Sequence, residues 1–115
     1  MRRVEKPWGH EEIWAETEDY LGKLLFIRAG HRLSLQHHQV KDETIRVSEG
    51  CLEVLLEDDA GEMVTWILEP GDSLRVQPHR KHRFKGITDC YVYEVSTAYP
   101  DDVVRHQDDY GRQGD

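Results

Sequence analysis

Residues 43–57 read ETIRVSEGCLEVLLE. Apolar and polar residues alternate in two runs, which are joined by a short predicted turn at SEG. In the second run, Leu52, Val54 and Leu56 fall on one side of an extended chain, and two glutamates fall on the other. A hydrophobic period of two is typical of a β-strand that buries one face. The stretch therefore predicts two strands, each with an apolar inner face.

The same pattern continues on both sides of this stretch. Runs rich in β-branched and aromatic residues occur at KLLFIR, MVTWIL and CYVYEV, and turn-forming sequences such as RAGH, DDAGE, EPGD and KGITD lie between the runs. No helical stripe of convincing length appears before residue 97, and no internal repeat is visible. Many short strands in a small domain predict an all-β sandwich or barrel.

The length and charge of the chain narrow the range of partners. Its 115 residues suit a single domain over residues 1–115. The formal net charge is −8, with 23 acidic against 15 basic residues, which argues against nucleic acid and anionic membrane surfaces as partners. The longest aliphatic and aromatic run, LLFI, is far shorter than the ~20 residues that a membrane span needs.

We expect a cytoplasmic location. The charged N-terminus MRRVEKPWGHEE is not followed by the apolar stretch of a secretory signal. Cys51 and Cys90 form no C-x-x-C pair and lie in apolar alternating runs. This pattern favours buried free thiols in a reducing compartment over a disulfide.

The end of the chain changes character. Residues 100–115 form an acidic C-terminal tail without strand alternation. One interpretation is a solvated tail whose last few residues are disordered. The apolar side chains of Val103, Val104 and Tyr110 favour another, in which part of the tail packs back on the barrel.

Several polar side chains fall at alternate positions of the predicted strands, so that they lie on one face. In LSLQHH, Gln36 and His38 share one face with Ser34, and His37 lies on the opposite face as a packed or surface residue. In ETIRVS, Glu43 falls on the inward, apolar face. A carboxylate there is unfavourable by several kcal/mol unless it is paired or bound to a cation.

A second stretch, HRKHRF, places His82 on the same face as Phe84. Residues 30–43 and 79–84 together hold five of the seven histidines, at positions 31, 37, 38, 79 and 82. Two imidazoles, a carboxylate and an amide oxygen that converge inside a β-barrel would form a site for a borderline divalent ion.

These residues resemble the two sequence motifs of the cupin superfamily. The first motif runs from Gly30 through Gln36-His37-His38 and Glu43 to Gly50, and Gln36 stands where many cupins have a histidine. The second runs from Gly71 to His82, with Gln77 in place of the usual proline and His79 in place of the usual glycine. His79 would therefore have to adopt a backbone conformation that glycine takes freely.

Within the cupins, the chain is most similar to the C-terminal domain of type II mannose-6-phosphate isomerases. KPWGHEEIW, GHRLSLQHH, KHRF and EVSTAYPDDVVRHQDDYGR carry this resemblance over nearly the whole chain. It implies an all-β double-stranded β-helix, a jelly-roll barrel that forms a homodimer through an edge strand or sheet face. It also implies a divalent metal ion, zinc before manganese, iron or nickel, with the ligands Gln36, His38, Glu43 and His82.

The resemblance implies a metal-dependent isomerase that interconverts a sugar phosphate of the mannose-6-phosphate and fructose-6-phosphate type. One alternative is a cupin that binds a small sugar or acid without turnover, and another is a non-haem iron dioxygenase, which also uses two histidines and a carboxylate. Glu94 is either the general base or a solvated strand residue. Lys6, Arg32 and Arg83 are candidate contacts to the substrate, although KPWG also suits an edge strand that packs through Trp8.

Overall fold

Alternating residues form strands throughout the computed structural model, which describes residues 2–112 and contains no helix among them. Eleven strands follow one another within this range. They are β1 (Arg2–Lys6), β2 (Gly9–Glu16), β3 (Tyr20–Ile27), β4 (Leu35–His37), β5 (Glu43–Glu49), β6 (Leu52–Glu57), β7 (Met63–Leu68), β8 (Ser73–Val76), β9 (His82–Gly86), β10 (Cys90–Thr97) and β11 (Val104–Gln107).

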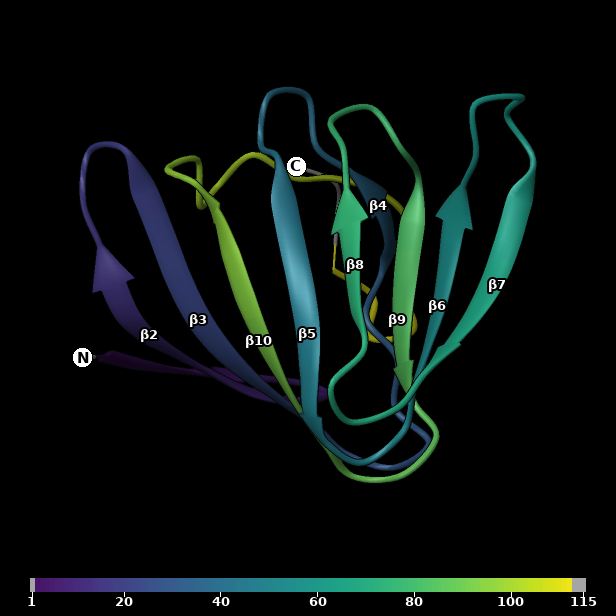
Figure 1. Ribbon diagram of the computed structural model, residues 1–115, viewed down its shortest axis with the longest axis horizontal. Helices are drawn as coiled ribbons and strands as arrows, with labels where there is room; N and C mark the ends of the chain where they lie inside the picture. The colour runs from purple at the N-terminus through teal and green to yellow at the C-terminus, as the bar shows by residue number, and fades with distance from the viewer. Residues whose placement is uncertain (1, 113–115) are drawn as a thin grey trace.

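The strands form two antiparallel sheets, as expected for a jelly roll. One sheet has the order β1-β2-β3-β10-β5-β8 and the other the order β11-β4-β9-β6-β7 (Figure 1). Strands β5 and β6, which the opening stretch encodes, follow one another in sequence but belong to different sheets. The chain therefore crosses from one layer to the other at Gly50 and Cys51.

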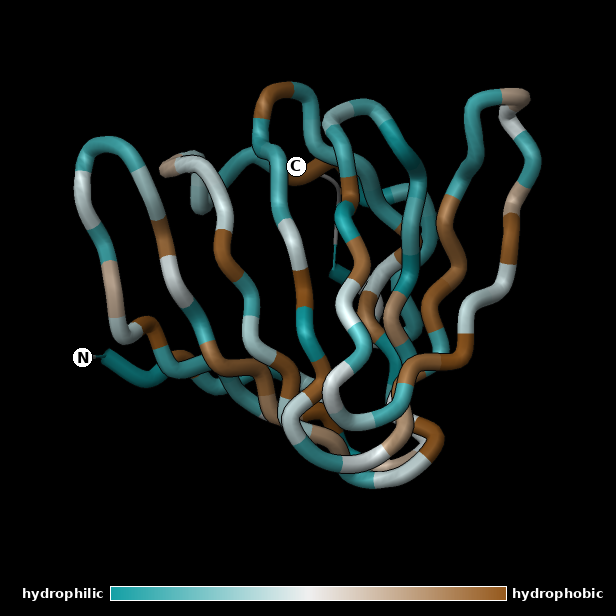
Figure 2. The backbone as a smooth tube through the Cα atoms, in the orientation of Figure 1, coloured by the Kyte–Doolittle hydropathy of each residue, from teal (hydrophilic) through white to brown (hydrophobic). Residues whose placement is uncertain are grey.

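The core lies between the inner faces of the two sheets. Ile45 and Val47 of β5 and Leu52 and Val54 of β6 are fully buried, which confirms the faces predicted from the alternation. Figure 2 shows hydrophobic and hydrophilic residues alternating along the strands, while the loops are mostly hydrophilic. Trp8 also belongs to the core, so the KPWG segment packs through its indole next to the edge strand β1.

The C-terminal segment packs back on the barrel instead of extending into solvent. Residues Val104–Gln107 form β11, which pairs with β4 at the edge of the five-stranded sheet. The sequence analysis missed this strand because its four residues show no apolar alternation. Tyr110 packs against the core cluster, while the disorder expected at the chain end concerns residues 113–115, outside the described range.

Two further sequence predictions concern the backbone of His79 and the state of the two cysteines. His79 adopts a positive φ of 69°, the conformation that the cupin motif normally assigns to glycine. Cys51 and Cys90 are free, as predicted, and Cys90 is buried, but the predicted burial of Cys51 is wrong because this residue is partly exposed. Residues 2–112 include no helix with the length and apolarity of a membrane span.

Candidate metal centre

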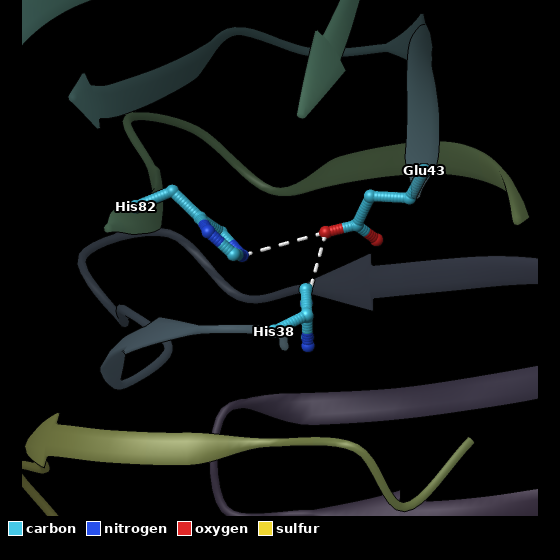
Figure 3. A group of neighbouring side chains, drawn as sticks. All are labelled: His38, Glu43 and His82. Atoms are coloured by element: carbon cyan, nitrogen blue, oxygen red, sulfur yellow. Dashed lines mark hydrogen bonds and ion pairs between the residues drawn. The ribbon is translucent and has the colours of Figure 1, made fainter. Parts of the chain in front are cut away.

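Three of the predicted ligands meet inside the barrel (Figure 3). Glu43 is the first residue of β5, His82 is the first residue of β9, and His38 directly follows β4. One donor atom from each of the three lies within 4.8 Å of the other two, and all three side chains are buried. The two sheets therefore bring together residues that are up to 44 positions apart in the sequence (82 − 38).

Backbone carbonyls orient both imidazole rings. His38 Nδ1 donates a hydrogen bond to the Asp102 carbonyl at 2.5 Å, and His82 Nδ1 donates one to the Arg80 carbonyl at 2.9 Å. A carbonyl can only accept, so each Nδ1 carries a proton, and Nε2 is the nitrogen of each ring that is available to a metal ion. Such hydrogen bonds fix the tautomer and orientation of histidines that bind metals.

Both Nε2 atoms point at one carboxylate oxygen. Glu43 Oε1 is 3.2 Å from His38 Nε2 and 3.4 Å from His82 Nε2. Within residues 2–112 the buried Nε2 of His82 has no hydrogen bond of normal geometry. Two imidazole nitrogens and a carboxylate oxygen that converge in a buried place are a donor set that fits a divalent metal ion.

The charge state of Glu43 also suits a ligand. Burial by itself raises the pKa of this carboxyl, but its interactions with His38 and His82, together with the charge of Lys41, outweigh burial. They hold the pKa of Glu43 well below its usual range, so the side chain is a carboxylate at neutral pH.

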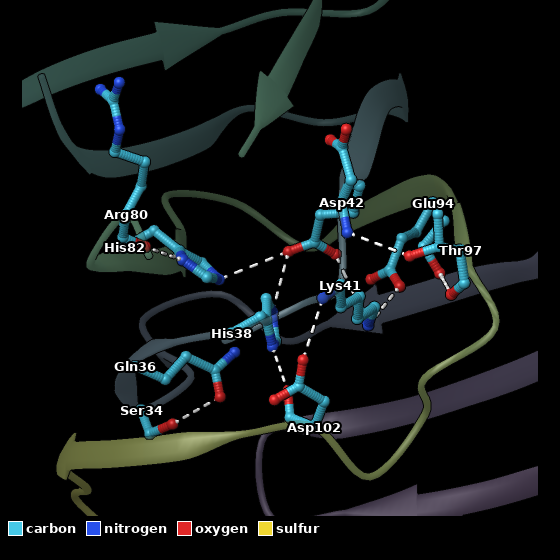
Figure 4. Close-up of polar contacts among 12 residues, drawn as sticks. Ser34, Gln36, His38, Lys41, Asp42, Arg80, His82, Glu94, Thr97 and Asp102 are labelled. Atoms are coloured by element: carbon cyan, nitrogen blue, oxygen red, sulfur yellow. Dashed lines mark hydrogen bonds and ion pairs between the residues drawn. The ribbon is translucent and has the colours of Figure 1, made fainter. Parts of the chain in front are cut away.

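Gln36 lies beside this triad. It is in β4 directly opposite His82 in β9, and its side chain lines the same cavity as His38 and Glu43. Its Oε1 accepts a hydrogen bond from the Ser34 hydroxyl at 3.0 Å (Figure 4). The amide is thus placed close to the triad, with its oxygen oriented by a neighbouring side chain.

A cavity of about 650 Å³ gives access to the candidate metal centre. Side chains from both sheets and from the C-terminal segment line it, including Trp8, Leu25 and Phe84 on the apolar side. This volume is within the range of about 300–1,000 Å³ that is usual for small-molecule sites. A small substrate could therefore reach the buried triad.

A buried ion pair adjoins the triad. Lys41 Nζ lies 2.9 Å from Glu94 Oε2 and 3.8 Å from Glu43 Oε2 (Figure 4). Burial and the nearby charge of Glu43 raise the pKa of Glu94. Burial alone would lower the pKa of Lys41, but the charges of Glu94 and Glu43 reverse this and raise it. Glu94 thus lines the cavity as a buried residue beside a metal ligand.

The sequence analysis did not identify Lys41. The available signal was its place two residues before Glu43, because an extended chain that continues backwards from β5 puts both side chains on one face. It also missed Asp102, whose carboxylate accepts hydrogen bonds from the backbone amides of Gln39, Val40 and Lys41. Nothing local in the YPDD sequence indicated that contact.

The remaining histidines lie outside the triad. His37 faces away from it and packs on His106, with 2.8 Å between His37 Nδ1 and His106 Nε2. His31 contacts the Tyr110 hydroxyl at 2.8 Å, and the side chain of His79 is exposed. His79 still supports the site, because its backbone N–H donates to the His38 carbonyl at 2.6 Å.

The three predicted substrate contacts have different locations. Lys6 lines the cavity. Arg32 and Arg83 instead form ion pairs with Asp109, at 2.5 Å and 3.0 Å, and neither is among the residues that line the cavity. These two arginines attach the C-terminal segment to the five-stranded sheet.

Comparisons with known proteins agree with the fold. The chain is similar to KdgF from Halomonas sp. at 25% identity, with a TM-score of 0.72 and coverage of 89% of this chain and 90% of that chain. An RmlC-like cupin from Shewanella frigidimarina is 19% identical, with a TM-score of 0.69 and coverage of 81% and 78%. No curated protein matches the sequence.

Part of a longer protein shares the same fold. The capsular polysaccharide assembling protein CapF from Staphylococcus aureus is 13% identical, with a TM-score of 0.81, and the match covers 92% of this chain but 34% of CapF. The family model described as mannose-6-phosphate isomerase C-terminal matches residues 1–108. The chain therefore belongs to the mannose-6-phosphate isomerase C-terminal family of the cupin superfamily.

Proposed function

We propose that this protein is a metal-dependent isomerase that acts on a sugar or sugar phosphate of the mannose-6-phosphate and fructose-6-phosphate type. The observation that carries the proposal is the buried triad of His38, Glu43 and His82, of which His38 and Glu43 line a cavity of about 650 Å³. Membership of a family described as mannose-6-phosphate isomerase C-terminal supports the choice of reaction.

The triad would hold a divalent ion, with Gln36 as the predicted fourth ligand. Such an ion would polarise a substrate carbonyl and stabilise negative charge on the neighbouring oxygens. Zinc suits this set of nitrogen and oxygen donors, and manganese, iron or nickel are alternatives.

Glu94 is the proposed general base. The reaction must move a proton between two adjacent carbons, and Glu94 is a buried carboxyl that lines the cavity beside the metal ligands. Its raised pKa makes it a stronger base than an ordinary carboxylate. Lys41 fixes its position through the contact of 2.9 Å and balances the charges of Glu94 and Glu43.

Incubation with mannose 6-phosphate or fructose 6-phosphate in deuterated water tests the proposal. Elemental analysis of the purified protein comes first, because zinc or manganese favours an isomerase or a binding protein. Iron with substrate-dependent oxygen consumption would favour a dioxygenase, since two histidines and a carboxylate also suit non-haem iron. In the incubation with deuterated water, we expect solvent deuterium at C1 or C2 of the sugar phosphate.

The Glu94→Gln variant provides the matched control. It should keep the metal and lose deuterium incorporation, because it removes the base and leaves the triad intact. Metal-loaded protein that exchanges no deuterium with either substrate would contradict the isomerase for those substrates and leave a binding protein.

A further inference from the structure

The cavity holds a group of positively charged side chains in addition to the metal ligands. Lys6 ends β1, Arg105 lies in β11 and Arg112 follows β11, and all three line the cavity. Burial lowers the pKa of the Lys6 ammonium, the charge of Glu11 opposes this, and the nearby charges of Lys23, Arg112 and Arg105 lower the pKa further. Cations from the two ends of the chain are therefore gathered closely enough to repel one another.

The strand register links this group to the candidate metal centre. Arg105 in β11 is directly opposite Gln36 in β4, and Gln36 is directly opposite His82 in β9. Directly opposed residues of antiparallel strands project from the same face with Cβ atoms about 5 Å apart. Arg105 is therefore about 10 Å from His82 along one row of the sheet. A six-carbon sugar can bridge that distance.

The charges in this part of the cavity are not all balanced by acidic side chains. Lys23 pairs with Glu11 at 3.3 Å, and Arg112 pairs with Asp108 at 2.9 Å. Lys6 forms no ion pair with any acidic residue within the range 2–112 that the structure describes. A half-buried ammonium without an ion-pair partner among the described residues is suited to an anion from outside the protein.

We propose that Lys6, Arg105 and Arg112 bind an anionic group of the substrate, a phosphate or a carboxylate, while the sugar oxygens face the metal centre. This proposal rests on the proposed function and specifies its substrate class as acidic sugars. Arg105 supplies a planar guanidinium group that recognises both kinds of oxyanion, and Lys6 supplies a point charge. Arg112, whose Nε and Nη2 bind Asp108, adds positive charge beside them. Selectivity for an acidic sugar would then come from residues of the two chain ends.

Isothermal titration calorimetry tests the proposal. The metal-loaded protein is titrated with three sugars that differ only at C6. The probes are mannose 6-phosphate, mannuronate and neutral mannose. We expect the protein to bind at least one of the two acidic sugars about tenfold or more tightly than mannose, because a charge-assisted hydrogen bond contributes at least this factor. Whichever acidic sugar binds more tightly identifies the group as phosphate or carboxylate.

Variants of one strand separate the contribution of Lys6 from that of net charge. Lys6→Met should remove most of the preference for an acidic sugar over mannose, and Lys6→Arg should keep this preference. Arg3→Met loses the same charge from the opposite face of β1, where Arg3 pairs with Glu5, and should leave the preference unchanged. The proposal would be overturned if the wild type bound neither acidic sugar more tightly than mannose. It would also be overturned if Lys6→Met kept the preference for acidic sugars as fully as Arg3→Met does.

Failure of this proposal can be distinguished from failure of the proposed function. A retained preference for acidic sugars without deuterium incorporation would contradict only the isomerase. Deuterium incorporation into the sugar without any preference for an acidic C6 group would contradict only the anion site.

Discussion

At the scale of single residues, neighbours in the sequence have different environments. His38 is 3% exposed, and its Nε2 points at Glu43, while His37 packs on His106 at the surface. A strand places consecutive side chains on opposite faces, so the two imidazoles cannot serve one site. The position of each histidine relative to the pleat, and not the number of histidines, determines which can bind the ion.

Substitution of His38 should therefore abolish metal binding. His38→Ala and Glu43→Ala each remove a donor from the triad, and we expect the metal affinity to fall by more than about 100-fold, since loss of an outer-shell partner alone reduces it by about 10–100-fold. Elemental analysis after dialysis and competition with a chromogenic chelator would measure this. The matched control is His37→Ala, which should bind metal like the wild type. Stoichiometric metal in both triad variants would show that the site is elsewhere.

Lys41 has a structural role that can be separated from catalysis. Lys41→Met leaves the buried carboxylates of Glu43 and Glu94 together without their shared cation, so we expect the metal-free protein to lose about 3–5 kcal/mol of stability. Urea unfolding measures the change. Lys81→Met, at an exposed site, is the control and should change stability by less than about 0.5 kcal/mol.

A double variant tests the reason for that loss. Adding Glu94→Gln to Lys41→Met removes one of the two like charges and should recover part of the stability. Equal instability of the single and double variants would mean that lost packing, and not charge, explains the effect.

At the scale of elements, the C-terminal segment forms part of the candidate metal centre. Its strand β11 extends the five-stranded sheet. The Asp102 carbonyl accepts the hydrogen bond from His38, and the Asp102 carboxylate binds the amides of the loop between β4 and β5. The segment thus orients one ligand and holds the loop that leads to another. A tail that looks solvated from its composition is a wall of the cavity.

Neutralising Asp102 should loosen this arrangement. Asp102→Asn weakens the hydrogen bonds to the loop amides, so we expect a loss of about 1–2 kcal/mol of stability at pH 7, together with a metal affinity lowered by up to about tenfold. Urea unfolding and metal titration measure the two effects. Asp101→Asn at the adjacent exposed position is the control, and an equal effect there would contradict the role of Asp102.

The same contact has a defined pH dependence. Burial alone would raise the pKa of Asp102, but the three backbone hydrogen bonds outweigh it and lower that pKa. The stabilisation is therefore fully present above the unfolded pKa of about 3.9 and is lost as the pH falls through the lowered folded value. The stability difference between wild type and Asp102→Asn should shrink as the pH falls below about 4.

At the scale of the whole molecule, the outer face of the six-stranded sheet carries a patch of exposed apolar side chains. Trp14, Tyr20, Tyr93 and Val95 are each more than 40% exposed on the neighbouring strands β2, β3 and β10. Trp14 lies against Gly22, where an added Cβ would meet its ring at 2.8 Å. An apolar patch of this kind marks an interaction surface on a protein that is otherwise highly charged.

We expect a homodimer that uses this face. A twofold interface places the same patch of both copies together, so Val95→Lys would bring two like charges close to each other and should shift the protein to monomer. Sedimentation velocity across a range of concentrations measures the change. Ile87→Lys, equally exposed in the loop after β9, should leave the dimer intact. A wild type that sediments as a monomer would contradict the expectation.

The sequence alone determined the features that depend on local periodicity and spacing. Alternation predicted the buried faces of β5 and β6 and the inward position of Glu43, because a strand fixes the direction of each side chain relative to its neighbours. The spacing from Gly30 to Gly50 and from Gly71 to His82 indicated the cupin fold and three residues that meet in the triad.

Only the tertiary structure decided which separate segments meet. The pairing of Lys41 with Glu94, the attachment of the loop by Asp102 and the position of Arg105 opposite Gln36 all depend on contacts between distant strands. Strand register is set by the packing of the whole barrel, and a shift of one residue would turn each of these side chains to the other face. Local periodicity contains no information about which strands become neighbours.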